Sequence, residues 1–443
     1  MARRAQNVPL AVALNGRRVG LLRRAPSGAI DFAYATEWLA WEEAFAISLS
    51  LPLREEIYVG APVTAAFDNL LPDNSDIRLK VAQRVGAEGQ DVYSLLSAIG
   101  RDCVGALQFL PEDGELTAPG GVDGEPISEA QIADLLANLA SAPLGLNAEV
   151  DFRISLAGAQ EKTALLRVDG RWLRPHGATP TTHILKPQIG HLANGVDLSC
   201  SVENEYLCME LTRALGLPVA NVEMASFAGR SALVVERFDR LWTRDQRLLR
   251  LPQEDMCQAL GYPSSRKYEA EGGPGAQPIL RLLAGGDEPM ADRRAFVRAL
   301  AVFWLLGATD GHAKNFSLHL EPRGRYRLAP LYDILSVQPA VAAHQVPLKQ
   351  FKLSMAMGKS RNYAMSDVAP RHIVETGALG GLRDRFVLED LQALVEISRQ
   401  AVDAVLSRLP ADFPASVAEP VVEGLRTRMA VLERYLLATA SVG

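Results

Sequence analysis

A nearly continuous apolar stretch, Phe296–Leu306, constrains the fold of this chain more than any other feature. It is too short to cross a bilayer, which takes about 20 such residues, and it is typical of a buried helix. Gly307 follows at the position of a helix C-cap. We therefore expect a rigid buried helix to hold the polar loop that comes next, and functional side chains are commonly mounted on such loops.

That loop contains Asp310-Gly-His-Ala-Lys-Asn315, and Tyr332-Asp333-Ile334 follows downstream. An Asp, an Asn five residues later and a second Asp further on have the spacing of a protein-kinase active centre. Asp310 can accept the proton of an attacking hydroxyl, while Asn315 and Asp333 offer oxygen ligands for Mg²⁺ on nucleotide phosphates. Two alternatives stay open. Asp-Gly and Asn also occupy ordinary turns, and Asp333, at the end of a predicted strand over 325–332, can simply cap a turn.

A second group of residues indicates a phosphate-binding loop. The segment Phe152–Leu166 is predicted as two strands around Ala157-Gly158-Ala159, and small residues there let backbone N–H groups approach phosphate. Lys162-Thr163 is like the end of a Walker A motif, but Glu161 stands where that motif needs glycine, and no helix signal follows. The pattern thus favours a kinase-type loop over a P-loop NTPase, with a plain hairpin turn as the alternative.

Two further strands complete the expected nucleotide site. His183–Pro187 places Lys186 near the end of a short apolar strand. In kinase sites such a Lys holds the α- and β-phosphates and pairs with a helix Glu, for which Glu203 and Glu205 are candidates. Ser231–Asp239 is predicted as a buried strand whose backbone at Glu236 to Phe238 can contact the adenine edge. The alternatives are a solvent-facing Lys and a core strand with an exposed end.

Composition excludes several classes of protein. The 443 residues are 48% apolar and 22% charged, which is typical of a soluble globular protein with two or three cores. The net charge of −6 gives no reason to expect direct DNA binding. We interpret the arginines at 237, 240, 244, 247 and 250 as a solvated face. The four cysteines have no paired spacing, and no signal peptide or membrane segment is evident, so we expect free thiols and a cytoplasmic location without membrane attachment.

The order of the predicted elements indicates an α+β protein. Residues 8–20 form a hairpin with Asn15-Gly16 at its turn, and Ile30–Tyr34 forms a third strand. Phe67–Ser75 and Ile77–Val85 are predicted as helical segments broken by Pro72. These elements make a small N-terminal α+β subdomain at 1–110. A nucleotide-binding lobe at 111–240 follows, with a linker at 111–126 and a helix capped at Ser128, and a mostly helical lobe at 241–443 carries the catalytic and metal-binding loops.

Taken together, these motifs resemble the HipA family of serine/threonine kinase toxins. The similarity extends over nearly the whole chain and rests on nine segments: 49–53, 67–73, 99–107, 151–163, 179–184, 235–240, 251–258, 307–317 and 332–334. The resemblance implies a small N-terminal subdomain on a kinase-like two-lobed core. It further implies ATP and Mg²⁺ as cofactors, phosphorylation of protein serine or threonine, a HipB-like antitoxin as partner, and operator DNA bound through the antitoxin complex. Glutamyl-tRNA synthetase is the implied substrate, and its phosphorylation would stall translation and cause dormancy.

The resemblance also assigns roles to individual positions. It implies Asp310 as catalytic base, Asn315 and Asp333 as Mg²⁺ ligands, and Ser155 as an autophosphorylated residue whose modification shuts the enzyme off. The implied ATP-binding residues are Ala157, Gly158, Ala159, Gln160, Glu161, Lys162, Thr163, Lys186, Glu236, Arg237, Phe238, His312, Lys314 and Tyr332. Because a fold does not fix its acceptor, a small-molecule phosphotransferase remains an alternative, as does a co-repressor that acts through its antitoxin.

Overall fold

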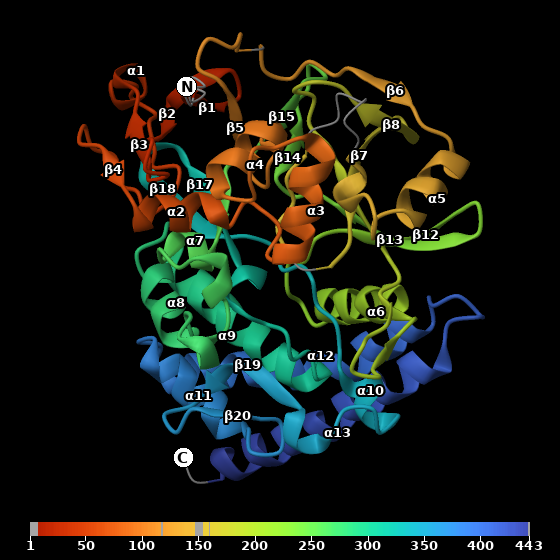
Figure 1. Ribbon diagram of the computed structural model, residues 1–443. Coiled ribbons are helices and arrows are strands. Elements are labelled where there is room, and N and C mark those ends of the chain that lie inside the picture. Colours follow the sequence, from red (N-terminus) through yellow and green to blue (C-terminus); the bar gives the residue numbers. More distant parts are fainter. Residues whose placement is uncertain (1–7, 117, 147–153, 159, 442–443) are drawn as a thin grey trace. The chain divides into compact units, whose positions relative to one another are not determined.

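The computed structural model describes residues 8–116, 118–146, 154–158 and 160–441. The chain divides into two compact units. The first contains residues up to Pro187 together with Ser226–Ser265 and His319–Tyr326, and the second contains Gln188–Ala225, Arg266–Leu318 and Arg327–Gly443. The predicted α+β class is confirmed (Figure 1). The division at residues 110 and 240 stays a prediction.

The first unit begins with a five-stranded sheet in the order β4-β3-β2-β1-β5. Its hairpin is confirmed, since Asn15 and Gly16 have φ values of 45° and 78° at the turn. Edge-to-face contacts of Phe67 with Phe32 and Phe109 fill the core beside it. The elements are β1 Leu10–Leu14, β2 Arg17–Arg24, β3 Ile30–Tyr34, α1 Thr36–Leu39, β4 Tyr58–Val59, α2 Ala61–Asp68, α3 Ser75–Val85, α4 Val92–Ile99 and β5 Leu107–Pro111.

One prediction in this region is wrong, because most of Phe67–Ser75 is not helical. Helix α2 ends at Asp68, and α3 starts only at Ser75. The side chain of Asn74 accepts hydrogen bonds from the backbone N–H groups of Asp76 and Ile77. An N-cap of this kind begins a new helix and leaves the residues around Pro72 as a connecting loop.

A six-stranded sheet, in the order β12-β13-β9-β7-β8-β6, carries the nucleotide-side motifs. The predicted helix after Ser128 is confirmed with its capping box, and the predicted linker contributes the edge strand β6. The elements are β6 Gly124–Pro126, α5 Glu129–Ala137, β7 Thr163–Val168, β8 Arg171–Pro175, β9 His183–Pro187, β12 Val222–Phe227 and β13 Arg230–Glu236.

The first strand predicted within Phe152–Leu166 does not form in the part of the segment that the structure describes. Ile154 makes only an isolated bridge to Asp102. Ser155 then donates its N–H to the carbonyl of Asp102 at 2.9 Å and its hydroxyl to the carbonyl of Leu70 at 2.7 Å. The segment therefore uses loop carbonyls of the N-terminal region as partners, and no second strand lies alongside it.

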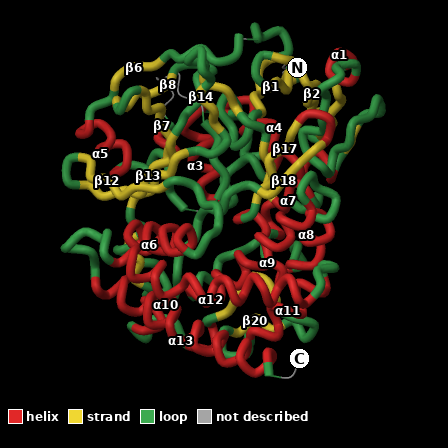
Figure 2. Tube along the Cα trace, turned by 180° about the vertical axis from the view of Figure 1, so that it is seen from behind, coloured by secondary structure: helices red, strands yellow, loops and turns green. Residues whose placement is uncertain are grey.

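In the second unit, helices surround α9 (Pro289–Leu306), the predicted buried helix (Figure 2). Gly307 caps it in the left-handed conformation, with φ 68°, as expected. The other elements are β10 Gly190–His191, β11 Asp197–Leu198, α6 Ser201–Ala214, α8 Ala276–Leu283, α10 Gln338–Ala342, β19 Lys352–Met357, β20 Asn362–Ala364, α11 Pro370–Leu379, α12 Asp384–Leu406 and α13 Ala415–Ala440.

The remaining elements are short strands and one short helix, most of which belong to the first unit. They are β14 Arg240–Trp242, β15 Leu248–Arg250, β16 Gln253–Asp255, α7 Met256–Ala259, β17 Ser317–Glu321 and β18 Arg325–Leu328. The strand predicted over 325–332 is therefore too long. Pro330 cannot donate a backbone hydrogen bond, and only Leu331 pairs again, in an isolated bridge to Val219.

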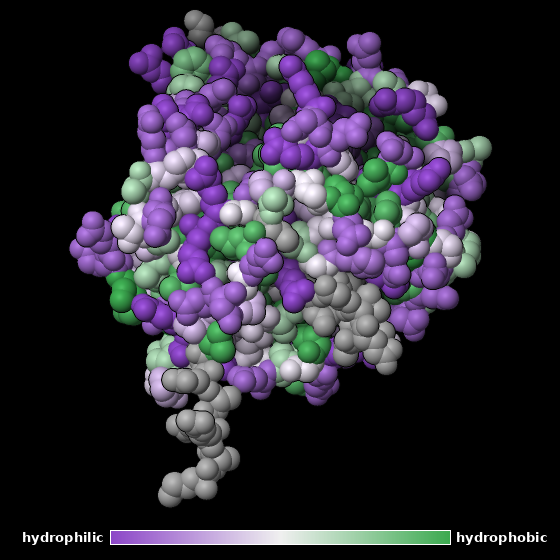
Figure 3. Space-filling view, turned by 90° about the horizontal axis from the view of Figure 1, so that it is seen from above, coloured by the Kyte–Doolittle hydropathy of each residue, from purple (hydrophilic) through white to green (hydrophobic). Residues whose placement is uncertain are grey.

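The surface is mainly polar on the face that Figure 3 shows, where hydrophobic side chains are interspersed among hydrophilic ones. In the part of the chain that the structure describes, no helix combines the length and apolar character that a membrane span requires.

Candidate active site

The end of α9 fixes the start of the candidate catalytic loop. Beyond the cap at Gly307, the N–H of Ala308 bonds to the carbonyl of Phe303 at 2.9 Å. A Cβ on Gly311 would lie 2.3 Å from the ring of Phe303, so only glycine lets the loop pass this close to the helix. A 3₁₀ turn, Ala313–Asn315, then leads into β17. The backbone path of the loop is thus set by contacts to buried α9.

Asp310 is the exposed acid of this loop, with 61% of its side chain accessible. Its Oδ1 accepts a hydrogen bond of 2.9 Å from the Tyr268 hydroxyl, and its Oδ2 lies 3.9 Å from Nε2 of the buried His312. The Tyr268 and His312 rings meet edge to face at 5.0 Å. A carboxylate that is accessible to solvent can accept a proton from an incoming hydroxyl.

Asn315 and Asp333 are both held in the second unit. The Asn315 amide nitrogen donates to the backbone carbonyl of Asp310 at 2.7 Å, which leaves its oxygen as the atom available for a cation. The Tyr332 hydroxyl bonds to the Ser317 hydroxyl at 2.6 Å and to the carbonyl of Lys314 at 2.7 Å. Tyr332, the residue before Asp333, is therefore hydrogen-bonded to residues on both sides of Asn315 in the sequence.

Asp333 itself adopts a left-handed backbone conformation with φ 59°, which is uncommon for a residue other than glycine. The flanking segment supports it: Leu331 exchanges backbone hydrogen bonds with Pro218 and Ala220, and Ser336 exchanges two with the side chain of Asn204. Such enforced conformations concentrate at functional sites.

The donor chemistry of Asn315 and Asp333 fits Mg²⁺, because both offer only oxygen. Among the described residues, no three His, Cys, Asp or Glu side chains cluster as a metal centre. A site made of one carboxylate, one amide and nucleotide phosphates agrees with that finding, since Mg²⁺ is usually bound through one or two carboxylates plus phosphates.

In the first unit, the predicted phosphate loop closes on itself around Gly158. Gly158 has φ 104°, and a Cβ there would meet the Lys162 ammonium at 2.5 Å. That ammonium donates to the carbonyl of Ala157 at 2.8 Å, while the carbonyl of Gly158 accepts from the N–H of Asp73 at 3.2 Å. The turn thus requires glycine, as its sequence indicated. Ala159 lies outside the described residues.

The remaining residues of this loop face in different directions. Gln160 donates to the carbonyl of Pro187 at 3.4 Å, Glu161 is exposed, and the buried Thr163 hydroxyl donates to the carbonyl of Leu144 at 2.7 Å. Thr163 therefore has a structural partner, which its place in the sequence did not indicate.

The strands β9 and β13 bring Lys186 and the predicted adenine-binding segment into one sheet. Lys186, 6% exposed, lies opposite Leu233, and Glu236 lies opposite His183. The N–H of Arg237 donates to the carbonyl of Thr182 at 2.9 Å. Phe238 is half-buried and packs edge to face on His319 at 5.5 Å. The alternative of a solvent-facing Lys186 is excluded by its burial.

Three of the five arginines that we interpreted as a solvated face are instead buried. Arg237, Arg240 and Arg250 surround Asp102 at 3.5, 2.8 and 3.0 Å, and Arg237 and Arg240 also contact Asp239 at 2.8 and 3.1 Å. The Arg237 guanidinium is therefore fully engaged in a structural cluster. Although burial opposes ionisation, these arginines hold the pKa values of both aspartates below the ordinary range. Asp102 lies so far from its partners in sequence that no local pattern predicts the cluster.

Ser155 is completely buried, and its hydroxyl is the donor to Leu70 described above. Its environment does not present the hydroxyl to solvent. Tyr268, in contrast, makes a contact to Asp310 that we did not predict. The cluster Gly272-Gly-Pro-Gly275 signals a tight turn nearby, but nothing in the sequence shows that this turn reaches Asp310.

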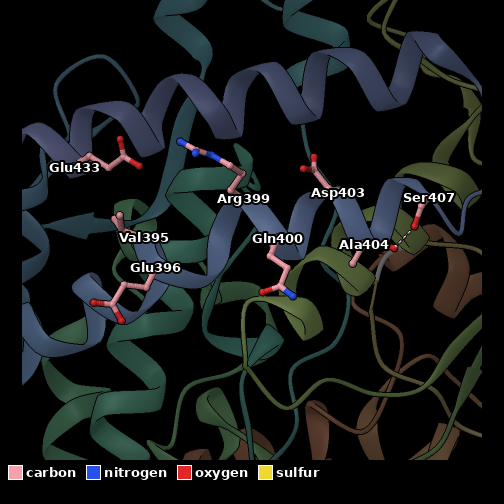
Figure 4. A pocket seen from close by; sticks show the side chains of 8 residues that line it. All are labelled: Val395, Glu396, Arg399, Gln400, Asp403, Ala404, Ser407 and Glu433. Carbon is pink, nitrogen blue, oxygen red and sulfur yellow. Dashed lines mark hydrogen bonds between the residues drawn. The ribbon is translucent and has the colours of Figure 1, made fainter.

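A groove of about 790 Å³ lies elsewhere in the second unit, on α12 and α13 (Figure 4). Arg399 and Asp403 of α12 point towards α13, from which Glu433 points back. None of the candidate catalytic or metal-binding residues lines it.

Comparison with known proteins defines the class to which these features belong. The HipA N-terminal domain matches residues 10–110, and the HipA-like C-terminal domain matches residues 154–411. The chain therefore belongs to the HipA family.

Individual relatives match along most of their length. The putative kinase Y4mE of Sinorhizobium fredii is 38% identical over 396 residues, which cover 88% of this chain and 90% of that protein. The serine/threonine-protein kinase toxin HipA of Shewanella oneidensis is 26% identical over 389 residues, covering 85% and 84%. A solved complex of HipA, HipB and operator DNA from that organism superposes with a TM-score of 0.78 at 25% identity, covering 96% of this chain and 97% of its counterpart.

Proposed function

We propose that this chain is a serine/threonine-protein kinase that transfers phosphate from ATP with Mg²⁺ and acts as the toxin of a type II toxin–antitoxin system. The catalytic loop is the observation that carries the proposal. An exposed Asp310 carboxylate stands on a backbone fixed by α9, and Asn315 is bonded to the same residue. The names of the relatives support a kinase.

In this proposal each part has one task. Asp310 takes the proton of the acceptor hydroxyl as its oxygen attacks the γ-phosphorus, and ADP leaves. Asn315 and Asp333 hold Mg²⁺, which neutralises charge on the phosphates when bound. Lys162, Lys186 and the backbone at 157–163 bind the phosphates, and the backbone at 236–238 binds adenine. His312, Lys314 and Tyr332 complete the ATP contacts.

A pair of aspartate variants tests the catalytic role. Asp310→Ala removes the base and should lower phosphate transfer by about 10²–10⁴-fold. Asp412→Ala changes an exposed acid between α12 and α13 and should leave the rate unchanged. Transfer of labelled phosphate and the melting temperature are measured for both. An Asp310→Ala protein that transfers phosphate at the wild-type rate would rule out this role.

The metal role is tested separately by Asp333→Asn, which removes charge and keeps shape. Calorimetric titration with MgATP should show weaker binding for this variant, with the melting temperature nearly unchanged. Equal affinities would contradict the assignment.

We further propose glutamyl-tRNA synthetase as the phosphorylated protein, a HipB-like antitoxin as partner, and a cytoplasmic site of action. The partner is supported by the HipA–HipB–operator DNA complex of Shewanella oneidensis. Phosphoproteomics of cells that express wild type or Asp310→Ala tests the target. If another protein is phosphorylated and the synthetase is not, the assignment of the synthetase as the target is wrong.

The same complex favours a second role as co-repressor, with DNA contacted through the antitoxin. The net charge of −6 suits an indirect contact better than a direct one. If the role is structural, repression of an operator reporter should persist with Asp310→Ala. Loss of repression in that variant would tie repression to catalysis instead.

A further inference from the structure

The turn that contains Tyr268 is built independently of its contact to Asp310. A Cβ on Gly273 would lie 2.0 Å from the carbonyl oxygen of Arg266, and Gly272 has φ 87°. Glu269, the next residue after Tyr268, accepts a 2.7 Å hydrogen bond from the N–H of Ala356 in β19. The glycines and the hydrogen bond to β19 therefore hold this turn in place without the Tyr268 side chain.

The catalytic loop is bonded to the same turn. The N–H of Ala313 donates to the carbonyl of Lys267 at 3.3 Å, and the His312 ring packs on Tyr268. With both sides held, the Tyr268 hydroxyl is brought to 2.9 Å from Oδ1 of Asp310, although that carboxylate is largely exposed. A hydrogen bond from a hydroxyl held in this way restricts the rotamers of the carboxylate and so the direction in which its oxygens face.

We propose, on the basis of the kinase function above, that Tyr268 is a positioning residue for Asp310. Its hydroxyl donates to Oδ1 and restricts the rotamer of the side chain, which sets the direction in which the carboxylate receives the proton of the substrate serine or threonine. Losing this bond should slow the chemical step, because that step requires a correctly oriented base. Nucleotide binding should be unaffected, because it does not depend on the orientation of Asp310.

Tyr268→Phe is the test, since it removes one oxygen and keeps the ring against His312. The full-length chain is assayed with MgATP and glutamyl-tRNA synthetase, with Tyr435→Phe on α13 as the matched control. We expect kcat to fall about 10-fold and the KM for ATP to stay within about twofold. The melting temperature and MgATP affinity should match those of the control.

The outcomes separate this inference from the function on which it rests. An active wild type together with a Tyr268→Phe variant that keeps its kcat overturns the positioning role alone. A variant whose rate falls only in proportion to the loss of folded protein overturns it as well, because that is a structural effect. A wild type that transfers no phosphate overturns the kinase assignment and this inference with it.

Discussion

The buried charge cluster around Asp102 should contribute strongly to the stability of the first unit. The Asp102 side chain is 3% exposed and lies near three guanidinium groups. It also accepts hydrogen bonds from the N–H and hydroxyl of Thr181 at 3.0 and 2.7 Å. Asp102→Asn keeps the shape of the side chain but removes its charge, so that the cluster contains three buried arginines and one aspartate, Asp239. Breaking a buried pair in this way costs about 3–5 kcal/mol.

For a unit of this size, each kcal/mol changes the melting temperature by about 2–4 °C, so we expect a loss of roughly 6–20 °C. Asp245→Asn is the matched control, because Asp245 forms a 2.7 Å pair with Arg247 in which both side chains are about half exposed. A pair as exposed as this one contributes little to stability, because water and salt screen it. Calorimetric melting at pH 7.5 compares the two variants. If Asp102→Asn melts within a degree or two of Asp245→Asn, the cluster does not stabilise the fold as argued.

The pH dependence supplies a second measure of the same cluster. The arginines lower the pKa values of Asp102 and Asp239, so each aspartate stabilises the fold fully above its unfolded pKa of about 3.9. That stabilisation is lost as the pH falls through the lower, folded values. The difference in stability between wild type and Asp102→Asn should therefore shrink below about pH 4. A difference that is constant from pH 7 to pH 3 would contradict the role of charge.

Three further predictions concern single residues. Burial raises the pKa of Glu254 to about 8, so the free energy of unfolding of the wild type should decline as the pH rises from about 4.5 towards 8. Urea unfolding should show that this decline is absent in Glu254→Gln. Gly311→Ala should lower the rate of phosphate transfer at least about 10-fold, because the added Cβ displaces the loop from Phe303. Gly121→Ala is the control, since a Cβ there meets no atom within 4 Å, and it should leave the rate unchanged. Equal rates for the two variants would contradict the steric argument. Ser155 should carry phosphate in protein from expressing cells, and the phosphorylated fraction should bind ATP more weakly; mass spectrometry followed by nucleotide titration decides both points.

Local patterns predicted much of the fold because local physics determines those elements. The Asn15-Gly16 turn, the capping box at Ser128 and the cap at Gly307 each depend on residues close together in sequence. The errors occur where distant residues decide the structure. Ile154 and Ser155 pair with loop carbonyls of the N-terminal region instead of a strand.

The same distinction applies to the candidate site. Asp310, Asn315 and Asp333 were recognisable as candidates because their residue types and spacing are those that kinase chemistry requires. Neither the hydrogen bond from Tyr268 nor the burial of the arginines around Asp102 has a sequence signal, because both depend on segments that only folding brings together. A run of arginines is usually a solvated surface, and here a single distant aspartate reverses that expectation.

Regulation through Ser155 would act on a different part of the molecule from the catalytic loop. The catalytic loop is fixed within the second unit by α9 and by the bond between Asn315 and Asp310. Ser155 belongs to the first unit, where its hydroxyl donates to a carbonyl in a fully buried position.

A phosphate at Ser155 adds a charge of about −1.5 to −2 and replaces the donor with acceptor oxygens, which the carbonyl of Leu70 cannot satisfy. Burying such a group without donors is strongly unfavourable, so a phosphorylated segment would have to leave this position. Gly158 lies three residues after Ser155 and Lys162 lies seven, and the turn that we predict to bind phosphate would lose its support at Asp73. The modification would thus weaken nucleotide binding and leave the geometry of Asp310 and Asn315 unchanged.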